Sequence, residues 1–98
     1  MPQGCGTWPA IWEVIEPQWP NGGETDILEG VNDQGPNAAT LHTGSGCVMP
    51  AVREHTGTPT QRDCDANING NTGCGVRMNS PVSYGPEFNR AGGGWCVD

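Results

Sequence analysis

Three carboxylates are crowded into six consecutive residues of this chain, the stretch ETDILE at 24–29. Two carboxyl groups that flank a sugar linkage form the pair with which glycosidases cleave glycosidic bonds. A third carboxylate between them, here Asp26, can hydrogen-bond a catalytic Glu, and its charge raises the pKa of a neighbouring proton donor. The alternative interpretation is a row of surface charges on an edge strand, which discourages aggregation.

The spacing of these carboxylates constrains the strand that must carry them. Side chains alternate along a strand, so Glu24 and Asp26 share a face, whereas Glu29 should face the opposite way. One extra residue, a β-bulge around 26–28, would return Glu29 to the face of the other two. The two Glu carboxyl groups would then approach to ~5–6 Å, which is closer to the spacing of retaining than of inverting glycosidases. One acidic site therefore requires a break in strand alternation between Asp26 and Glu29.

Extended segments separated by turns surround the acidic stretch and predict an all-β fold. We expect strands over 10–16, 24–31 and 38–44, where β-branched, aromatic and other apolar residues recur. The Pro-, Asn- and Gly-containing segment 17–23 predicts a turn between the first two strands. Strands with turn signals every ten to fifteen residues or so favour a β-sandwich. The ordered strands should thus occupy about 8–44.

A long loop is predicted over about 45–80, because this segment is rich in Gly and Asn and shows no clear periodicity. Disulfides would order such a loop, and pairing cannot be deduced from spacing, so Cys47–Cys64 and Cys64–Cys74 both stay open. The chain has five cysteines, so one thiol lacks a partner within it. The disulfide candidates are Cys5, Cys47, Cys64 and Cys74, which leaves Cys96 as the candidate for the extra thiol.

Metal and cofactor sites are not expected. No two cysteines are spaced as CxxC, and no histidine is spaced from them as a zinc ligand. The segment 65–76 resembles the opening of an EF-hand loop, but Val76 stands where the bidentate Glu is needed. Ordinary turn chemistry of Asn and Gly explains that segment instead.

Composition narrows the classes of partner. The 98 residues suffice for one small domain at most, and only 34% of them are hydrophobic, so we expect a poor core in isolation. The formal net charge of −7 argues against nucleic acid and against an anionic membrane surface. The negative charge is compatible with a neutral or cationic ligand. Alternatively, it serves only the solvation of an exported protein. Trp8, Trp12 and Trp19 beside the carboxylates favour a binding cleft.

Three stretches resemble motifs of glycoside hydrolase family 16, closest to its fungal laminarinases, the endo-1,3(4)-β-glucanases. GTWPAIW at 6–12 resembles the G-x-W-P-A-x-W motif, and GETDILEG at 23–30 resembles the E-x-D-x-x-E signature. NAATLHTG at 37–44 resembles the adjoining strand, and the resemblance runs from about Met1 to Trp95. It implies a partial β-jelly-roll sandwich, concanavalin A-like, that spans 1–98 of a catalytic domain and lacks strands at both ends.

The resemblance also implies roles for individual residues. Glu24 would be the nucleophile, Glu29 the general acid/base and Asp26 the assisting carboxylate of a retaining mechanism. The implied substrate-binding residues are Trp12, Trp19, His42 and Trp8. Alternatively, His42 is a structural histidine and Trp8 is packed rather than facing the ligand.

The function implied is hydrolysis of internal β-1,3 bonds, and of mixed β-1,3/1,4 bonds, in laminarin-like glucans. The implied partner is a β-glucan polysaccharide or oligosaccharide, bound by a secreted monomer whose signal peptide is absent from this chain. The alternative is an inactive truncated fragment or a carbohydrate-binding remnant without turnover. The preference between the two linkages stays open.

Overall fold

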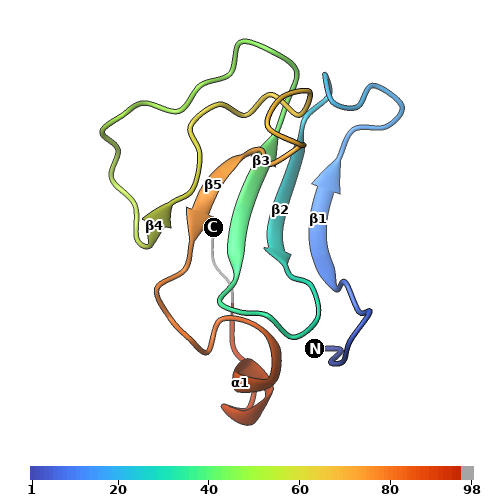
Figure 1. Cartoon of the computed structure of the whole chain (residues 1–98), viewed down its shortest axis with the longest axis vertical. Helices are drawn as coiled ribbons and strands as arrows, with labels where there is room; N and C mark the ends of the chain where they lie inside the picture. Colours follow the sequence, from blue (N-terminus) through green and yellow to red (C-terminus); the bar gives the residue numbers. More distant parts are fainter. Residues whose placement is uncertain (96–98) are drawn as a thin grey trace.

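The computed structural model describes residues 1–95, which form one antiparallel sheet with a short helix at one end (Figure 1). The strands follow the order β1-β2-β3-β5-β4 across the sheet, and every pairing is antiparallel. The elements are β1 (Ala10–Val14), β2 (Glu24–Glu29), β3 (Ala38–His42), β4 (Thr58–Pro59), β5 (Cys74–Arg77) and α1 (Gly85–Arg90). The all-β expectation is confirmed, apart from the six-residue helix.

The three strands predicted at 10–16, 24–31 and 38–44 are present, and each ends two residues earlier than expected. Strand β1 ends as the chain enters the Pro-rich turn, and the predicted turn over 17–23 joins it to β2. After β3, Thr43 leaves the sheet and forms an isolated bridge with Asp65. Local propensity therefore located these strands, and the following turns set their ends.

The prediction of an unbroken loop over 45–80 is wrong, because β4 and β5 lie within it. Strand β5 pairs with β3 over four residues, with Gly75 opposite Thr40 and close to the Ala39 carbonyl. A Cβ on Gly75 would lie 2.1 Å from the Ala39 carbonyl oxygen, so only glycine allows this approach. A four-residue strand with a glycine inside it gives too few side chains for a periodic pattern, and contacts with β3 define it instead.

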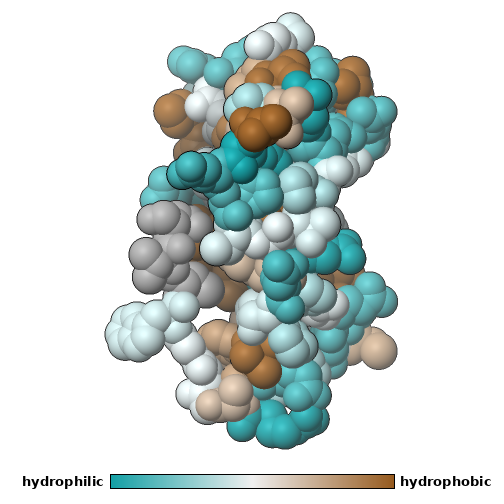
Figure 2. Space-filling model, turned by 90° about the vertical axis from the view of Figure 1, so that its left-hand side faces the viewer, coloured by the Kyte–Doolittle hydropathy of each residue, from teal (hydrophilic) through white to brown (hydrophobic). Residues whose placement is uncertain are grey.

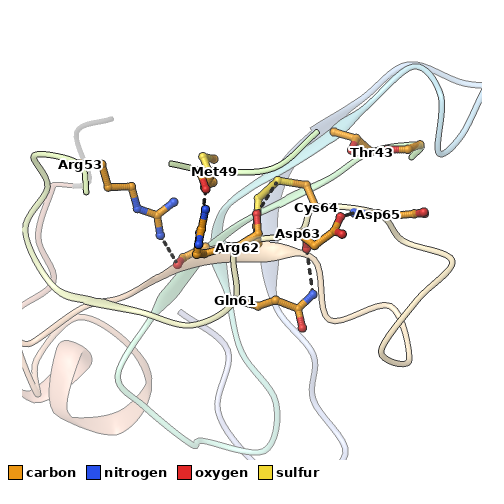
Figure 3. The surroundings of a disulfide bond; sticks show 11 residues. Thr43, Met49, Arg53, Gln61, Arg62, Asp63, Cys64 and Asp65 are labelled. Atoms are coloured by element: carbon orange, nitrogen blue, oxygen red, sulfur yellow. Dashed lines mark hydrogen bonds between the residues drawn. A yellow bond between two sulfur atoms is a disulfide. The ribbon is translucent and has the colours of Figure 1, made fainter. Parts of the chain in front are cut away.

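The disulfide joins Cys64 to Cys74, which confirms one of the two open pairings. Within the described residues, Cys5 and Cys47 form no disulfide, and Cys96 lies outside them. The bond ties the loop after β3 to the first residue of β5, and hydrogen bonds hold the loop around it (Figure 3). Arg62 Nε donates to the Met49 carbonyl at 2.9 Å, and Met49 N–H donates back to the Arg62 carbonyl at 2.8 Å. The segment between β3 and β5 is thus ordered by one disulfide, as expected, and by hydrogen bonds.

The described residues bury few side chains. The buried apolar residues are Leu28, Cys64, Ala66, Cys74 and Tyr84, and the buried polar residues are Asp26, Asn37 and His42. Seen from the β4 edge, hydrophobic residues form several separate patches among hydrophilic ones (Figure 2). None of the described helices has the length and apolarity to cross a membrane. A core in which polar residues are so prominent points to a site built into the sheet rather than to ordinary packing.

Candidate active site

Strand β2 carries a β-bulge at Ile27. Ile11 of β1 pairs with Leu28, but the next residue, Trp12, pairs with Asp26. Two adjacent residues of β1 therefore face residues two apart in β2, and Ile27 is the extra one. The predicted break in alternation between Asp26 and Glu29 is confirmed.

The bulge brings the three carboxylates to one face of the sheet. Glu24, Asp26 and Glu29 line a single open cleft of about 330 Å³ together with Trp8, Ala10 and Trp12. Asp26 is buried, with 2% of its surface exposed, whereas the two glutamates are half-buried. The arrangement has a buried carboxyl at its centre and two accessible carboxylates on either side of it.

Strand β3 brings His42 to the same cluster, because Glu24 pairs with His42 across the ladder. His42 Nε2 lies 3.2 Å from Asp26 Oδ2, and both side chains are buried. Glu24, Asp26 and His42 offer ligand atoms within 4.8 Å of one another, so of the described residues they have the geometry to hold a metal ion. Carboxyl groups that share protons need equally short distances, so the cluster alone does not indicate a metal.

The electrostatics of the cluster centre on Asp26. The pKa of Asp26 is raised from 3.8 to about 6, mainly by burial and then by the negative charges of Glu29 and Glu24. His42 acts against this rise, and a hydrogen bond with Glu24 adds to it. In mildly acidic solution Asp26 therefore carries a proton that it can share with Glu24.

The tryptophans divide into two groups. Trp8 Nε1 donates a hydrogen bond to Glu29 Oε1 at 2.9 Å, and Trp12 pairs with Asp26 on β1. Both indole rings line the cleft and are largely exposed, so both present an aromatic face to it. Trp19 lies in the turn between β1 and β2 and is not among the residues that line the described cleft.

Sequence reasoning missed one buried polar residue beside the site, Asn37. It precedes β3, and its side-chain amide contacts the backbone of β2 on both sides of Leu28. In the sequence it follows Gly35 and Pro36, so it has the signature of an ordinary turn residue. No local signal distinguishes an asparagine that ends a turn from one that is buried against a neighbouring strand.

The family model described as "XgeA-like, catalytic GH16 domain" matches residues 1–98, the full length of the chain. The chain belongs to this glycoside hydrolase family 16 group. The resemblance seen in the three sequence motifs is thereby confirmed. In this member of the family, two glutamates and one aspartate line one cleft, and the bulge lies between Asp26 and Glu29.

Two curated relatives support this family assignment. A probable glycosidase of Schizosaccharomyces pombe is 54% identical over 99% of this chain and 24% of its own length. An endo-1,3(4)-beta-glucanase of Arthroderma benhamiae is 46% identical over 96% of this chain and 21% of its own length. The chain therefore spans about a quarter of the length of these curated relatives.

A solved structure shows the same fold. Laminarinase 16A of Phanerochaete chrysosporium, solved with two beta-glucans in its donor and acceptor sites, matches with a TM-score of 0.94 and 66% identity. The match covers 97% of this chain and 32% of that laminarinase chain. The expected fold class, part of a β-jelly-roll sandwich, is thereby confirmed.

Proposed function

We propose that the protein of which this chain forms part hydrolyses internal β-1,3 bonds, and mixed β-1,3/1,4 bonds, of laminarin-like glucans with retention of configuration. The observation that carries the proposal is the bulge at Ile27, because it turns Glu29 into the cleft that also holds Glu24. Two carboxyl groups on one face are what a double displacement needs. Support for the substrate class comes from the relatives named as endo-1,3(4)-beta-glucanase and laminarinase.

In the first step, the Glu24 carboxylate attacks the anomeric carbon, and the bond to the leaving glucose oxygen breaks. Glu29 gives its proton to that oxygen, so the leaving chain departs as a neutral alcohol. The product of this step is a glucosyl ester on Glu24 and an ionised Glu29.

In the second step, the ionised Glu29 removes a proton from a water molecule, which attacks the anomeric carbon on the face that the leaving group left, opposite the ester to Glu24. The ester bond breaks, Glu24 leaves as a carboxylate, and the sugar keeps its original configuration. Glu29 ends the cycle protonated, ready for the next one.

The residues around this pair have supporting roles in the proposal. Asp26, with its raised pKa, shares a proton with Glu24. This proton stabilises the negative charge that Glu24 loses when the ester forms and regains when the ester breaks. His42, 3.2 Å from Asp26, holds that carboxyl in place. Trp8 and Trp12 provide aromatic faces for glucose rings in the cleft, and Trp19 provides one outside it.

The compartment and partners follow from the same proposal. The substrate is a neutral β-glucan, which an acidic cleft does not repel. The Cys64–Cys74 disulfide suits an oxidising compartment, so the proposed location is extracellular. We propose a monomer that engages neither nucleic acid nor membrane, in keeping with the negative charge.

The direct test uses Phanerochaete chrysosporium laminarinase 16A in which residues 1–98 of this chain replace the matching segment, called the grafted enzyme below. It should hydrolyse laminarin, and proton NMR should show that the new reducing ends first appear in the β configuration. Glu24→Gln should lower kcat by about 10³-fold or more, because no nucleophile is left, while laminari-oligosaccharides still bind.

Glu13→Gln is the matched control, since Glu13 is an exposed carboxylate of β1 outside the cleft. It should leave kcat unchanged. Hydrolysis that survives Glu24→Gln would disprove the assignment of the nucleophile. An inactive grafted enzyme that still binds laminarin would favour the alternative of a carbohydrate-binding remnant.

A further inference from the structure

The backbone of β2 loses its neighbour on one side just where the bulge begins. The ladder between β2 and β3 pairs Glu24 with His42, Thr25 with Leu41, and Asp26 with Thr40, and there it ends. Leu28 and Glu29 still pair with β1 on the other side. On the β3 side, the backbone groups of Ile27 and Glu29 need other partners, because unpaired backbone groups are costly inside a protein.

The side chain of Asn37 supplies both partners. Its Oδ1 accepts a hydrogen bond from the Glu29 N–H at 2.9 Å, and its Nδ2 donates one to the Ile27 carbonyl at 2.9 Å. Asparagine is suited to this because its short amide carries a donor and an acceptor side by side. One side chain thus bridges the bulge and replaces two ladder hydrogen bonds.

Asn37 is itself held firmly. Its N–H donates to Ser83 Oγ at 2.9 Å, and its carbonyl accepts from the Met78 N–H at 2.8 Å. The Ser83 hydroxyl in turn donates to the Ser80 carbonyl. Asn37 is 1% exposed, so water does not compete for its amide. The bridge is therefore anchored to the segment that follows β5.

We propose that Asn37 is a positioning residue, which clamps the bulge of β2 and thereby aims the carboxylate of Glu29 into the cleft. The inference rests on the proposed function, since it assigns Glu29 the acid/base role. Asn37 holds the backbone of Glu29, and Trp8 holds its carboxylate. Glu24 lies before the bulge, between Val14 of β1 and His42 of β3, and does not depend on this clamp.

The clamp predicts a selective defect. Loss of Asn37 should impair steps that need a proton from Glu29 and spare the attack by Glu24. A dinitrophenyl 2-deoxy-2-fluoro-β-laminaribioside isolates that attack, because its leaving group departs without a proton and the fluoroglucosyl ester on Glu24 accumulates. A purely structural role would weaken both reactions together.

The experiment compares Asn37→Leu with the unmodified grafted enzyme. The leucine side chain has the same number of non-hydrogen atoms and the same branching, but neither a donor nor an acceptor. Its kcat/KM on laminarin should fall by about 10²-fold, within the range for a displaced general acid. Its rate constant for labelling of Glu24 by the fluoro sugar should fall less than about threefold.

Asn37→Asp provides a rescue that only the clamp explains. A protonated Asp offers one donor and one acceptor, as Asn does, whereas the ionised form offers acceptors alone. The laminarin activity of Asn37→Asp, divided by that of the unmodified enzyme at the same pH, should therefore rise as the pH is lowered. The pH dependence of Asn37→Asp also tests the clamp if Asn37→Leu does not fold.

A double variant, Cys64→Ala with Cys74→Ala, controls for general destabilisation, because the disulfide lies outside the clamp. It should melt earlier, yet keep the ratio of the two reactions. Equal losses in both reactions for the Asn37 variants, or no rise of relative activity at low pH, would overturn the proposal. An inactive unmodified graft would instead count against the proposed function.

Discussion

At the scale of single residues, the proposed mechanism requires one carboxyl, Glu29, to act first as an acid and then as a base. Trp8 gives its indole N–H to Oε1 of Glu29, and an indole can donate but never accept. In the proposed mechanism, the proton for the leaving oxygen would therefore lie on Oε2. Trp8 would thus select which oxygen of Glu29 reacts, and it also offers an aromatic face to the cleft.

Trp8→Phe should lower kcat/KM of the grafted enzyme on laminarin by about tenfold, equivalent to ~1.4 kcal/mol, since it removes the N–H and keeps an aromatic ring. The loss should shrink for a dinitrophenyl laminaribioside, whose leaving group needs no proton in the first step. Steady-state kinetics with both substrates make the measurement.

Trp12→Phe is the matched variant, because Trp12 lines the same cleft and donates no hydrogen bond to a glutamate among the described side chains. It should raise KM for both substrates to a similar extent. If Trp8→Phe and Trp12→Phe behave alike, the hydrogen bond to Glu29 has no separate role.

The raised pKa of Asp26 predicts how stability depends on pH. Between pH 3.8 and about 6, the folded state holds a proton on Asp26 that the unfolded state has released. The contribution of Asp26 to the free energy of unfolding is therefore greatest below pH 3.8 and is lost as the pH rises through about 6. The full change is at most about 3 kcal/mol.

Asp26→Asn, which imitates the protonated acid, should lack this contribution. Urea unfolding of the grafted enzyme and of the variant between pH 4 and 7 measures it. The variant should gain stability relative to the unmodified enzyme as the pH rises. Parallel stability curves would show that Asp26 does not titrate in this range.

At the scale of elements, the direction of Glu29 depends on how β2 ends. The strand passes from its bulge into Gly30, where the ring of Tyr84 lies directly against the backbone. A Cβ at position 30 would lie 2.2 Å from Tyr84 Cζ, and Tyr84 is one of the largest buried side chains. Gly30 therefore lets the segment before α1 pack against the residue that follows Glu29.

Gly30→Ala should destabilise the grafted enzyme by about 1–3 kcal/mol, because the new methyl group forces the Tyr84 ring or the strand to move. Laminarin hydrolysis should fall as well, since Glu29 is adjacent. In a Tyr84→Ala background the same substitution should cost much less, and urea unfolding of the two single variants and the double variant measures this coupling. Additive costs would mean that the ring is not the obstacle.

At the scale of the whole molecule, the sheet has two unequal faces. One face carries the acidic cleft. On the other, where Ile11 and Leu28 point, a groove of about 490 Å³ is lined largely by apolar side chains, including those of Phe88 and Trp95. The described residues leave Trp95 97% exposed. A sandwich needs a second layer over such a face, and this chain matches only 32% of the laminarinase chain.

The 98-residue chain by itself should therefore bind a hydrophobic dye such as ANS, self-associate at micromolar concentration and hydrolyse laminarin weakly or not at all. In the grafted enzyme, the rest of the domain covers this face. The grafted enzyme should therefore neither bind the dye nor self-associate, and it should hydrolyse laminarin at the full rate. Dye fluorescence, sedimentation velocity and a reducing-sugar assay test this. Hydrolysis at the rate of the grafted enzyme by the isolated chain would contradict it.

The sequence by itself determined the strands around the site and the need for the bulge. Strand alternation is a local rule, so the separation of five positions from Glu24 to Glu29 already required an extra residue if both were to share a face. Apolar and β-branched residues likewise located β1, β2 and β3, because each segment shows its pattern within a few positions. The motifs at 6–12, 23–30 and 37–44 were sufficient to indicate the family.

Only the tertiary structure decided how distant residues hold that strand in place. The bridge from Asn37 to β2, the Trp8 bond to Glu29, the choice of Cys74 for Cys64 and the pairing of β5 with β3 all join residues eight or more positions apart. The same side chains had other partners open to them in the sequence. Which contact forms depends on the three-dimensional path of the chain, and spacing along the chain does not encode that path locally.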